Sequence, residues 1–192
     1  MAADAIIHIN GWPGSGKLTI ARELAALLDA RLLDNHTIIN PAEVLFERRD
    51  PLHHSLLKAL RAAILDHVAR MRPGLLILTD ALADDVHDSA VFDEYRALAA
   101  ARGAELVAIV LDCAPEQNAA RLVAAGRAER HKLTDPAVLA SLRANHRLLR
   151  PAGAPLVELD ITDLSPDVAA ALLAERCRAI FESTPQPAEP MP

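Results

Sequence analysis

The chain has 192 residues, of which 52% are apolar and 24% charged, so it can bury a sizeable core and is not a disordered chain. It carries 20 Lys and Arg against 26 Asp and Glu, a formal net charge of −6, and only 3% of its residues are aromatic. This balance argues against nucleic acid as a partner, because phosphate backbones bind basic surfaces and unpaired bases stack on aromatic side chains.

The sequence also predicts the cellular location and the domain organisation of the protein. No apolar run approaches the ~18–20 residues of a membrane span, and the first residues lack the basic start of a signal peptide. Two cysteines, Cys113 and Cys177, fit buried thiols in a reducing compartment better than a disulfide framework. We therefore expect a cytoplasmic protein with one domain over residues 1–183 and a disordered, proline-rich tail over residues 184–192.

Short apolar runs alternate along the chain with longer segments of helical periodicity. The runs cover residues 5–9, 31–33, 75–79, 106–111 and 156–159. The helical segments cover residues 17–29, 41–48, 52–71, 89–101, 115–125, 136–149 and 167–181. Three of the runs are continuously apolar, as in strands that are covered by helices on both faces. The alternation predicts an α/β fold with an open, parallel, five-stranded sheet.

In such sheets the ligand site lies beyond the carboxyl ends of the strands. The runs end on polar residues, which are Asn10, Asp34, Asp80, Asp112 and Asp160. Asp also favours the turns that follow strands, and this is the alternative interpretation of Asp112 and Asp160.

A glycine-rich loop follows the first run and opens the first helical segment. It reads Gly11-Trp12-Pro13-Gly14-Ser15-Gly16-Lys17-Leu18-Thr19. Its glycines let backbone N–H groups turn toward phosphate oxygens, the helix N-terminus adds partial positive charge, and Lys17 adds a full charge. The loop resembles the Walker A motif in the form used by adenylate-kinase-type and related small-molecule kinases. Its nine residues are therefore candidate nucleotide-binding residues; the alternative is a turn without a ligand.

One position of the loop departs from the strict motif. Leu18 stands where a hydroxyl usually binds Mg²⁺, and Thr19 follows it. We assign the hydroxyl role to Thr19 and give Leu18 only its backbone N–H.

Over about residues 5–165 the order and spacing of the elements resemble P-loop small-molecule kinases, such as nucleoside-monophosphate, shikimate and gluconate kinases, and AAA-type ATP-binding proteins. The resemblance implies ATP and Mg²⁺ as cofactors and a small-molecule acceptor. Asp34 matches the first acid of an Asp-x-Asp motif in shikimate- and gluconate-kinase-like proteins, and His36 departs from the second. We expect Asp34 to take a proton from the acceptor or to hold Mg²⁺ through water, and His36 to bind the acceptor. The alternative is a turn Asp beside a solvated His.

The same resemblance assigns further residues. Asp80 resembles the acid that positions Mg²⁺-bound water, so Asp80 and Thr19 are the candidate metal residues. The basic connection over residues 126–134 resembles a lid, whose arginines stabilise the transferring phosphoryl group. Arg127 and Arg130 are thus candidate catalytic residues together with Lys17 and Asp34, and Arg121 is a candidate nucleotide-binding residue. The alternative is an exposed connection between helices.

Residues 41–71 lie where small kinases place their acceptor-binding segment. The leading hypothesis is therefore a phosphotransferase. A second hypothesis is an ATPase or switch that acts on a protein partner, and a third is a binding module in which Leu18 has impaired catalysis. The acceptor and the oligomeric state stay open.

Overall fold

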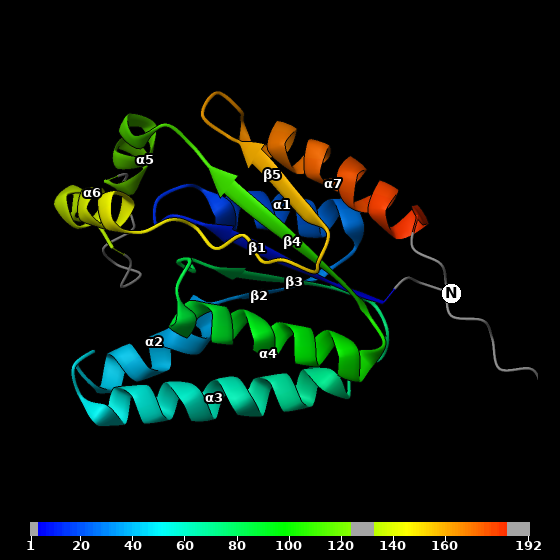
Figure 1. The fold of residues 1–192 in the computed structure, drawn as a ribbon, viewed down its shortest axis with the longest axis horizontal. Coiled ribbons are helices and arrows are strands. Elements are labelled where there is room, and N and C mark those ends of the chain that lie inside the picture. The colour runs from blue at the N-terminus through cyan, green and yellow to red at the C-terminus, as the bar shows by residue number, and fades with distance from the viewer. Residues whose placement is uncertain (1–3, 124–132, 184–192) are drawn as a thin grey trace, which may run out of the picture.

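The computed structural model describes residues 4–123 and 133–183 (Figure 1). In this part of the chain the strands are β1 (Ala5–Gly11), β2 (Arg31–Asp34), β3 (Leu75–Asp80), β4 (Glu105–Asp112) and β5 (Leu156–Asp160). They form one parallel sheet in the order β2-β3-β1-β4-β5. The predicted five-stranded parallel sheet is confirmed, and each strand contains the apolar run that predicted it.

The helices lie on both faces of this sheet, as the continuous apolar runs require (Figure 1). They are α1 (Lys17–Leu28), α2 (His36–Leu45), α3 (Pro51–Ala69), α4 (Val86–Arg102), α5 (Pro115–Leu122), α6 (Pro136–Asn145) and α7 (Pro166–Ser183). Ile7 and Ile9 of β1 pack with α1 and α7, whereas Ile6 packs with α4. Helix α3 packs outside this layer, against α2 and α4.

Both cysteines are buried and free, as predicted. None of the described helices is long and apolar enough to cross a membrane.

In two helices an end lies four or five residues from the predicted one, and the other described helix ends lie within three residues of it. Helix α2 begins at His36, five residues before the predicted start, and Pro41 lies inside it. Ile38 and Ala42 lie one turn apart and are both buried, so packing of this apolar pair outweighs the usual preference of proline for the first helical turn.

Helix α6 begins at Pro136, where Asp135 Oδ1 accepts a hydrogen bond from the N–H of Ala137, as the predicted cap requires. It ends at Asn145 rather than at residue 149. The segment that follows pairs instead with the residues after β3, through a bridge between Ala83 and Leu148. These β contacts bring the segment after α6 to the carboxyl edge of the sheet. Helix α5 ends at Leu122 with Val123 as its C-cap, and residues 124 and 125 of the segment predicted for it lie outside the described residues.

Candidate functional site

The glycine-rich loop joins β1 to α1 at the carboxyl edge of the sheet. Gly14 and Gly16 have positive φ angles of 84° and 95°. A β-carbon on Gly14 would lie 3.0 Å from side-chain atoms of Asn118 and Leu122, so this glycine permits α5 to pack closely. A β-carbon on Gly16 would meet no atom within 4 Å. The two glycines therefore serve different purposes, packing at Gly14 and open space beside the loop at Gly16.

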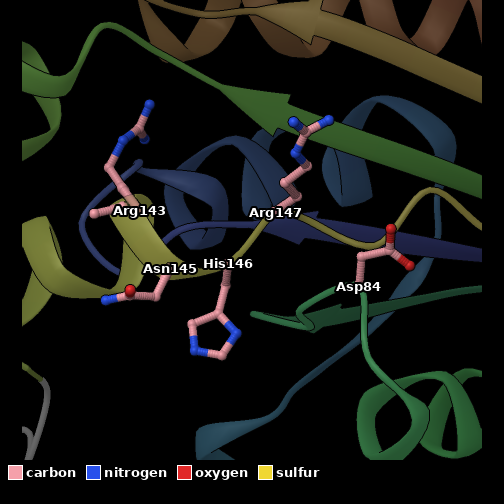
Figure 2. A pocket seen from close by; sticks show the side chains of 6 residues that line it. Asp84, Arg143, Asn145, His146 and Arg147 are labelled. Atoms are coloured by element: carbon pink, nitrogen blue, oxygen red, sulfur yellow. The ribbon is translucent and has the colours of Figure 1, made fainter.

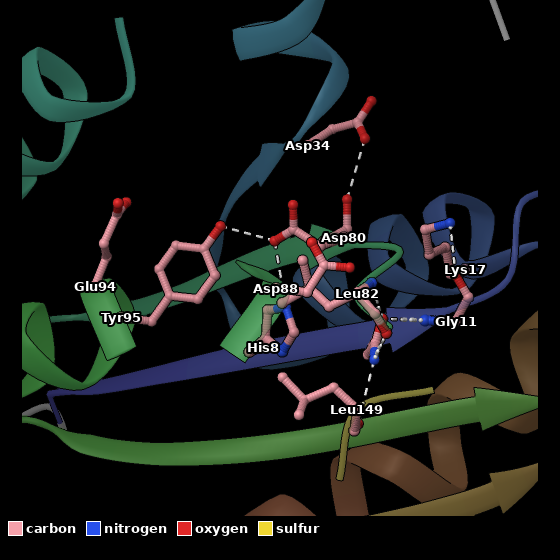
Figure 3. Close-up of polar contacts among 12 residues, drawn as sticks. His8, Gly11, Lys17, Asp34, Asp80, Leu82, Asp88, Glu94, Tyr95 and Leu149 are labelled. Carbon is pink, nitrogen blue, oxygen red and sulfur yellow. Dashed lines mark hydrogen bonds and ion pairs between the residues drawn. The ribbon is translucent and has the colours of Figure 1, made fainter. Parts of the chain in front are cut away.

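The N-terminus of α1 is suited to an anion. Its N-cap, Gly16, supplies no side-chain hydrogen bond, and the first turn contains no acidic residue. The first N–H groups of a helix lack partners within the helix and carry partial positive charge. Lys17 Nζ donates to the carbonyl oxygens of Gly11 at 3.0 Å and Trp12 at 3.3 Å, so its ammonium lies against the loop (Figure 3).

Helix α5 braces the loop from one side. Asn118 Nδ2 donates to the carbonyl of Pro13 at 2.8 Å. The guanidinium of Arg121 donates to the carbonyl of Ser15 at 3.1 Å and to two carbonyls after β5 at 3.0 and 3.1 Å. Arg121, which the sequence suggested as a nucleotide ligand, thus holds the loop against the turn between β5 and α7.

Trp12 of the loop is 7% exposed. Its indole packs among Leu122, Leu139 and Leu148. The guanidinium of Arg143, from α6, lies 5.5 Å from the centre of a Trp12 ring. Arg143 also donates at 3.0 Å to Asp112 Oδ1 and to Asn118 Oδ1. The Trp12 side chain therefore anchors the loop to α5 and α6.

The carboxylate of Asp34 is oriented by a neighbouring strand. The register of β2 and β3 sets Asp34 opposite Thr79, whose hydroxyl donates to Asp34 Oδ1 at 3.1 Å (Figure 3). His36 follows as the first residue of α2, and its Nδ1 lies 3.2 Å from Asn40 Oδ1. The structure thus places both predicted acceptor residues half-buried at the carboxyl end of β2.

Asp80 is only 3% exposed and has defined partners (Figure 3). Its Oδ2 accepts a hydrogen bond from the Tyr95 hydroxyl at 2.7 Å and lies 3.2 Å from His8 Nε2. Burial, followed by the charge of Asp80, raises the pKa of Tyr95 well above its usual value, so the phenol stays a donor. Because β1 and β3 pair in register, Asp80 lies opposite Asn10, next to the start of the loop.

The Asn10 side chain joins three segments at this edge. Its Nδ2 donates to the carbonyls of Leu82 at 2.9 Å and Leu149 at 3.2 Å. Its Oδ1 accepts from the N–H groups of Gly11 at 2.9 Å and Leu82 at 2.7 Å. All hydrogen-bonding capacity of this buried amide is used, which fixes the chain after β3 and after α6 beside the loop.

A polar pocket of about 390 Å³ lies in this region (Figure 2). It is lined by Asp84, Arg143, Ala144, Asn145, His146 and Arg147. The side chains of Arg143 and Arg147 extend to the same side of the segment, and His146 extends to the other (Figure 2). Arg147 is exposed, and its guanidinium forms no hydrogen bond or ion pair with the residues that the structure describes. Sequence reasoning missed this pocket because it extended α6 through His146 and Arg147.

The described residues include no group of three or more His, Cys, Asp or Glu side chains that could hold a metal ion. A metal at this edge would therefore need oxygens from a bound phosphate, which is the usual manner of Mg²⁺. Thr19 is exposed on the first turn of α1, and Leu18 is half-buried. Arg127 and Arg130 lie outside the described residues, so their assignment stays a prediction.

Known proteins share this architecture. A family model described as an AAA domain matches residues 7–137. A Chloroflexus aurantiacus protein, provisionally described as a kinase, has a TM-score of 0.67 at 18% identity, with 93% of this chain and 98% of that chain covered. A gluconokinase from Sinorhizobium meliloti has a TM-score of 0.58 at 15% identity, with 96% and 100% covered.

A shikimate kinase from Bacteroides thetaiotaomicron has a TM-score of 0.55 at 20% identity, with 94% and 99% covered. No curated protein matches the sequence. Because the family match spans more than half of its length, this chain belongs to the AAA domain family, and it has the P-loop fold of small kinases.

Proposed function

We propose that the chain is an ATP-dependent phosphotransferase that moves the γ-phosphoryl group of ATP to a small-molecule acceptor. One observation carries the proposal: a loop built to bind phosphate and an oriented carboxylate, Asp34, lie at the same edge of the sheet. Phosphoryl transfer requires a site that holds the phosphates and a group that orients or deprotonates the attacking hydroxyl. The fold shared with a gluconokinase and a shikimate kinase supports this assignment.

The nucleotide phosphates would lie on the loop over residues 11–19. The backbone N–H groups at the start of α1, including that of Leu18, would donate to them, and the open space beside Gly16 leaves room for their oxygens. Lys17 Nζ donates to neutral carbonyls, and a phosphate is a stronger acceptor for an ammonium. Arg121 would keep the loop in shape.

Magnesium would be held by Thr19 and Asp80 together with phosphate oxygens. When bound, Mg²⁺ neutralises charge on the phosphate oxygens. Asp80 Oδ2 already takes hydrogen bonds, so we assign Oδ1 to a metal-bound water.

The acceptor would lie near Asp34 and His36, with residues 41–71 around it. Asp34 would take the proton of the attacking hydroxyl, and the Thr79 hydroxyl keeps its carboxylate in position. Arg147 would give the pocket after α6 a cation for an anionic group of the acceptor or for the phosphoryl group in transfer. Arg127 and Arg130 would add charge from the lid segment.

The net charge and the cysteines support a class of partner and a cellular location for the enzyme. The acidic net charge favours a small molecule over nucleic acid as partner. The two buried thiols support a reducing, cytoplasmic location.

The test is ADP release from ATP and Mg²⁺ with and without a panel of acceptors: nucleosides, nucleoside monophosphates, gluconate, shikimate and hydroxylated antibiotics. Lys17→Ala serves as the blank. Arg178→Ala, which removes a cation of α7 that binds the Leu27 carbonyl at the C-terminal end of α1, away from the loop, serves as the matched control. Stimulation by one acceptor class in the wild type and control, and none in the blank, is the expected result. A slow rate that no acceptor changes would favour an ATPase or switch, and no turnover at all would favour an impaired binding module.

A further inference from the structure

A chain of hydrogen bonds runs from the outer helix α3 to the sheet edge. Arg61 of α3 donates from Nη1 to the Tyr95 hydroxyl at 3.0 Å, and this hydroxyl donates to Asp80 Oδ2 at 2.7 Å. The side chain of Arg61 is only 12% exposed, and Tyr95 is buried. Figure 3 shows the Tyr95 ring reaching from α4 to the carboxylate.

The chemistry of these three groups fixes which of them donates and which accepts in each hydrogen bond. A guanidinium can only donate and a carboxylate can only accept, so the Tyr95 proton must lie on the Asp80 side. The Tyr95 ring is held by edge-to-face contact with Phe92, with ring centroids 6.4 Å apart. A buried hydroxyl with one donor and one acceptor has a single satisfied orientation, and this orientation points at Asp80.

The packing of the helices determines which contacts connect α3 to Asp80. The main contacts of α3 are with α2 and α4, so its path to Asp80 leads through Tyr95 of α4. The guanidinium of Arg61 also lies 3.9 Å from Glu94, again on α4. A shift of α3 relative to α4 would withdraw Arg61 and remove the donor to Tyr95.

We infer that Tyr95 is a positioning residue for the carboxylate of Asp80. We also infer that Arg61 makes this position depend on how α3 packs against α4. The inference rests on the proposed function, which assigns Asp80 to the magnesium shell and residues 41–71 to the acceptor. An acceptor that fixes the packing of α3 against α4 would thereby also hold the Asp80 carboxylate in its working orientation.

The kinetic test compares Tyr95→Phe, Arg61→Met and the double variant, with Arg178→Met as the matched control for loss of an arginine. Tyr95→Phe keeps the buried ring, so its melting temperature verifies folding. We expect it to lower kcat about tenfold and to raise the Mg²⁺ concentration needed for half-maximal rate, with the KM for ATP changed less than about twofold. Arg61→Met should have a smaller effect in the same direction, and Arg61→Lys, which keeps a donor, should recover part of it.

The double variant decides whether Arg61 acts through Tyr95. If it does, the double variant is no slower than Tyr95→Phe alone, because residues in one network are not additive. Multiplied effects of the two substitutions, or an unchanged magnesium dependence in Tyr95→Phe, would overturn the inference.

A second measurement needs no turnover. Tyr95 is the only tyrosine of the chain, so protein labelled at the tyrosine ¹³Cζ gives one signal that reports on this hydroxyl. We expect Arg61→Met to shift this signal, and Mg²⁺ to shift it in the wild type bound to a non-hydrolysable ATP analogue. A signal that responds to neither change would refute the connection from Arg61 through Tyr95 to Asp80, even if phosphotransfer is found. Absence of phosphotransfer with a responsive signal would refute the proposed kinase activity and leave the link standing.

Discussion

Replacing Gly16 with Ala separates the binding of phosphate from the folding of the loop, because the chain offers a matched control. Gly16 caps α1 at φ 95° and ψ 3°, and Gly103 ends α4 at φ 63° and ψ 27°. A β-carbon on either glycine would meet no atom within 4 Å, so the folding cost in both is backbone strain. Left-handed backbone costs a residue with a β-carbon roughly 1–2 kcal/mol. Gly103 lies nearer the left-handed minimum and takes the lower value.

The strain predicts different losses of stability. For a chain of this length, 1 kcal/mol lowers the melting temperature by about 2–4 °C, so we expect a fall of about 2–4 °C for Gly103→Ala and about 4–8 °C for Gly16→Ala. A ligand at 100 times its Kd stabilises by about 2.7 kcal/mol. ATP with Mg²⁺ should therefore raise the melting temperature of the wild type and of Gly103→Ala by roughly 5–11 °C.

A thermal-shift assay with and without ATP and Mg²⁺ measures both effects. Gly16→Ala should show little rise, because its methyl group would occupy the space that phosphate oxygens need. An equal ATP-induced rise in Gly16→Ala and Gly103→Ala would refute the assignment of Gly16 to the phosphate cradle.

Three further predictions concern single side chains. Asp34→Asn should slow acceptor phosphorylation about 100-fold and change the Kd for ATP, measured by calorimetry, less than about twofold. Loss of ATP binding alone would assign Asp34 to the magnesium site and not to the acceptor site. Leu18→Ser should change the magnesium-dependent affinity for ATP less than about twofold if Thr19 supplies the hydroxyl, and a large gain would show that Leu18 impairs the site. Burial raises the pKa of the Cys177 thiol from 9.0 to about 11. Since only the unfolded thiol ionises between these values, the wild type should lose stability as pH rises from 9 to 11, by up to about 1 kcal/mol per pH unit. Urea unfolding should show a smaller loss for Cys177→Ala, and an identical pH dependence would contradict the assignment.

The strands and the phosphate loop could be predicted because their signals are local. A parallel strand covered on both faces needs an apolar run, and a loop that turns inward needs glycines at defined positions. Asp34 and Asp80 were found for the same reason, since each directly follows an apolar run.

The partners of these acids could not be predicted, because they depend on register and docking. His8 lies in an apolar strand and Tyr95 in a distant helix, and only the pairing of β1 with β3 and the packing of α4 bring them to Asp80. Arg121 lies beside the loop, as expected of a ligand, but the way α5 docks turns its guanidinium onto backbone carbonyls. The pocket at Arg147 was missed because β pairing of the following residues, a tertiary contact, ends α6 early.

Trp12 is the only tryptophan of the chain, and its place in the loop gives the protein an intrinsic optical probe. The indole is buried between α5 and α6, the two helices that border residues 124–132, and a guanidinium lies over its ring. Indole emission responds to nearby charge and to access of water. Any rearrangement of those helices during a catalytic cycle should therefore change the fluorescence of the unlabelled protein, and stopped-flow mixing can follow the movement in real time.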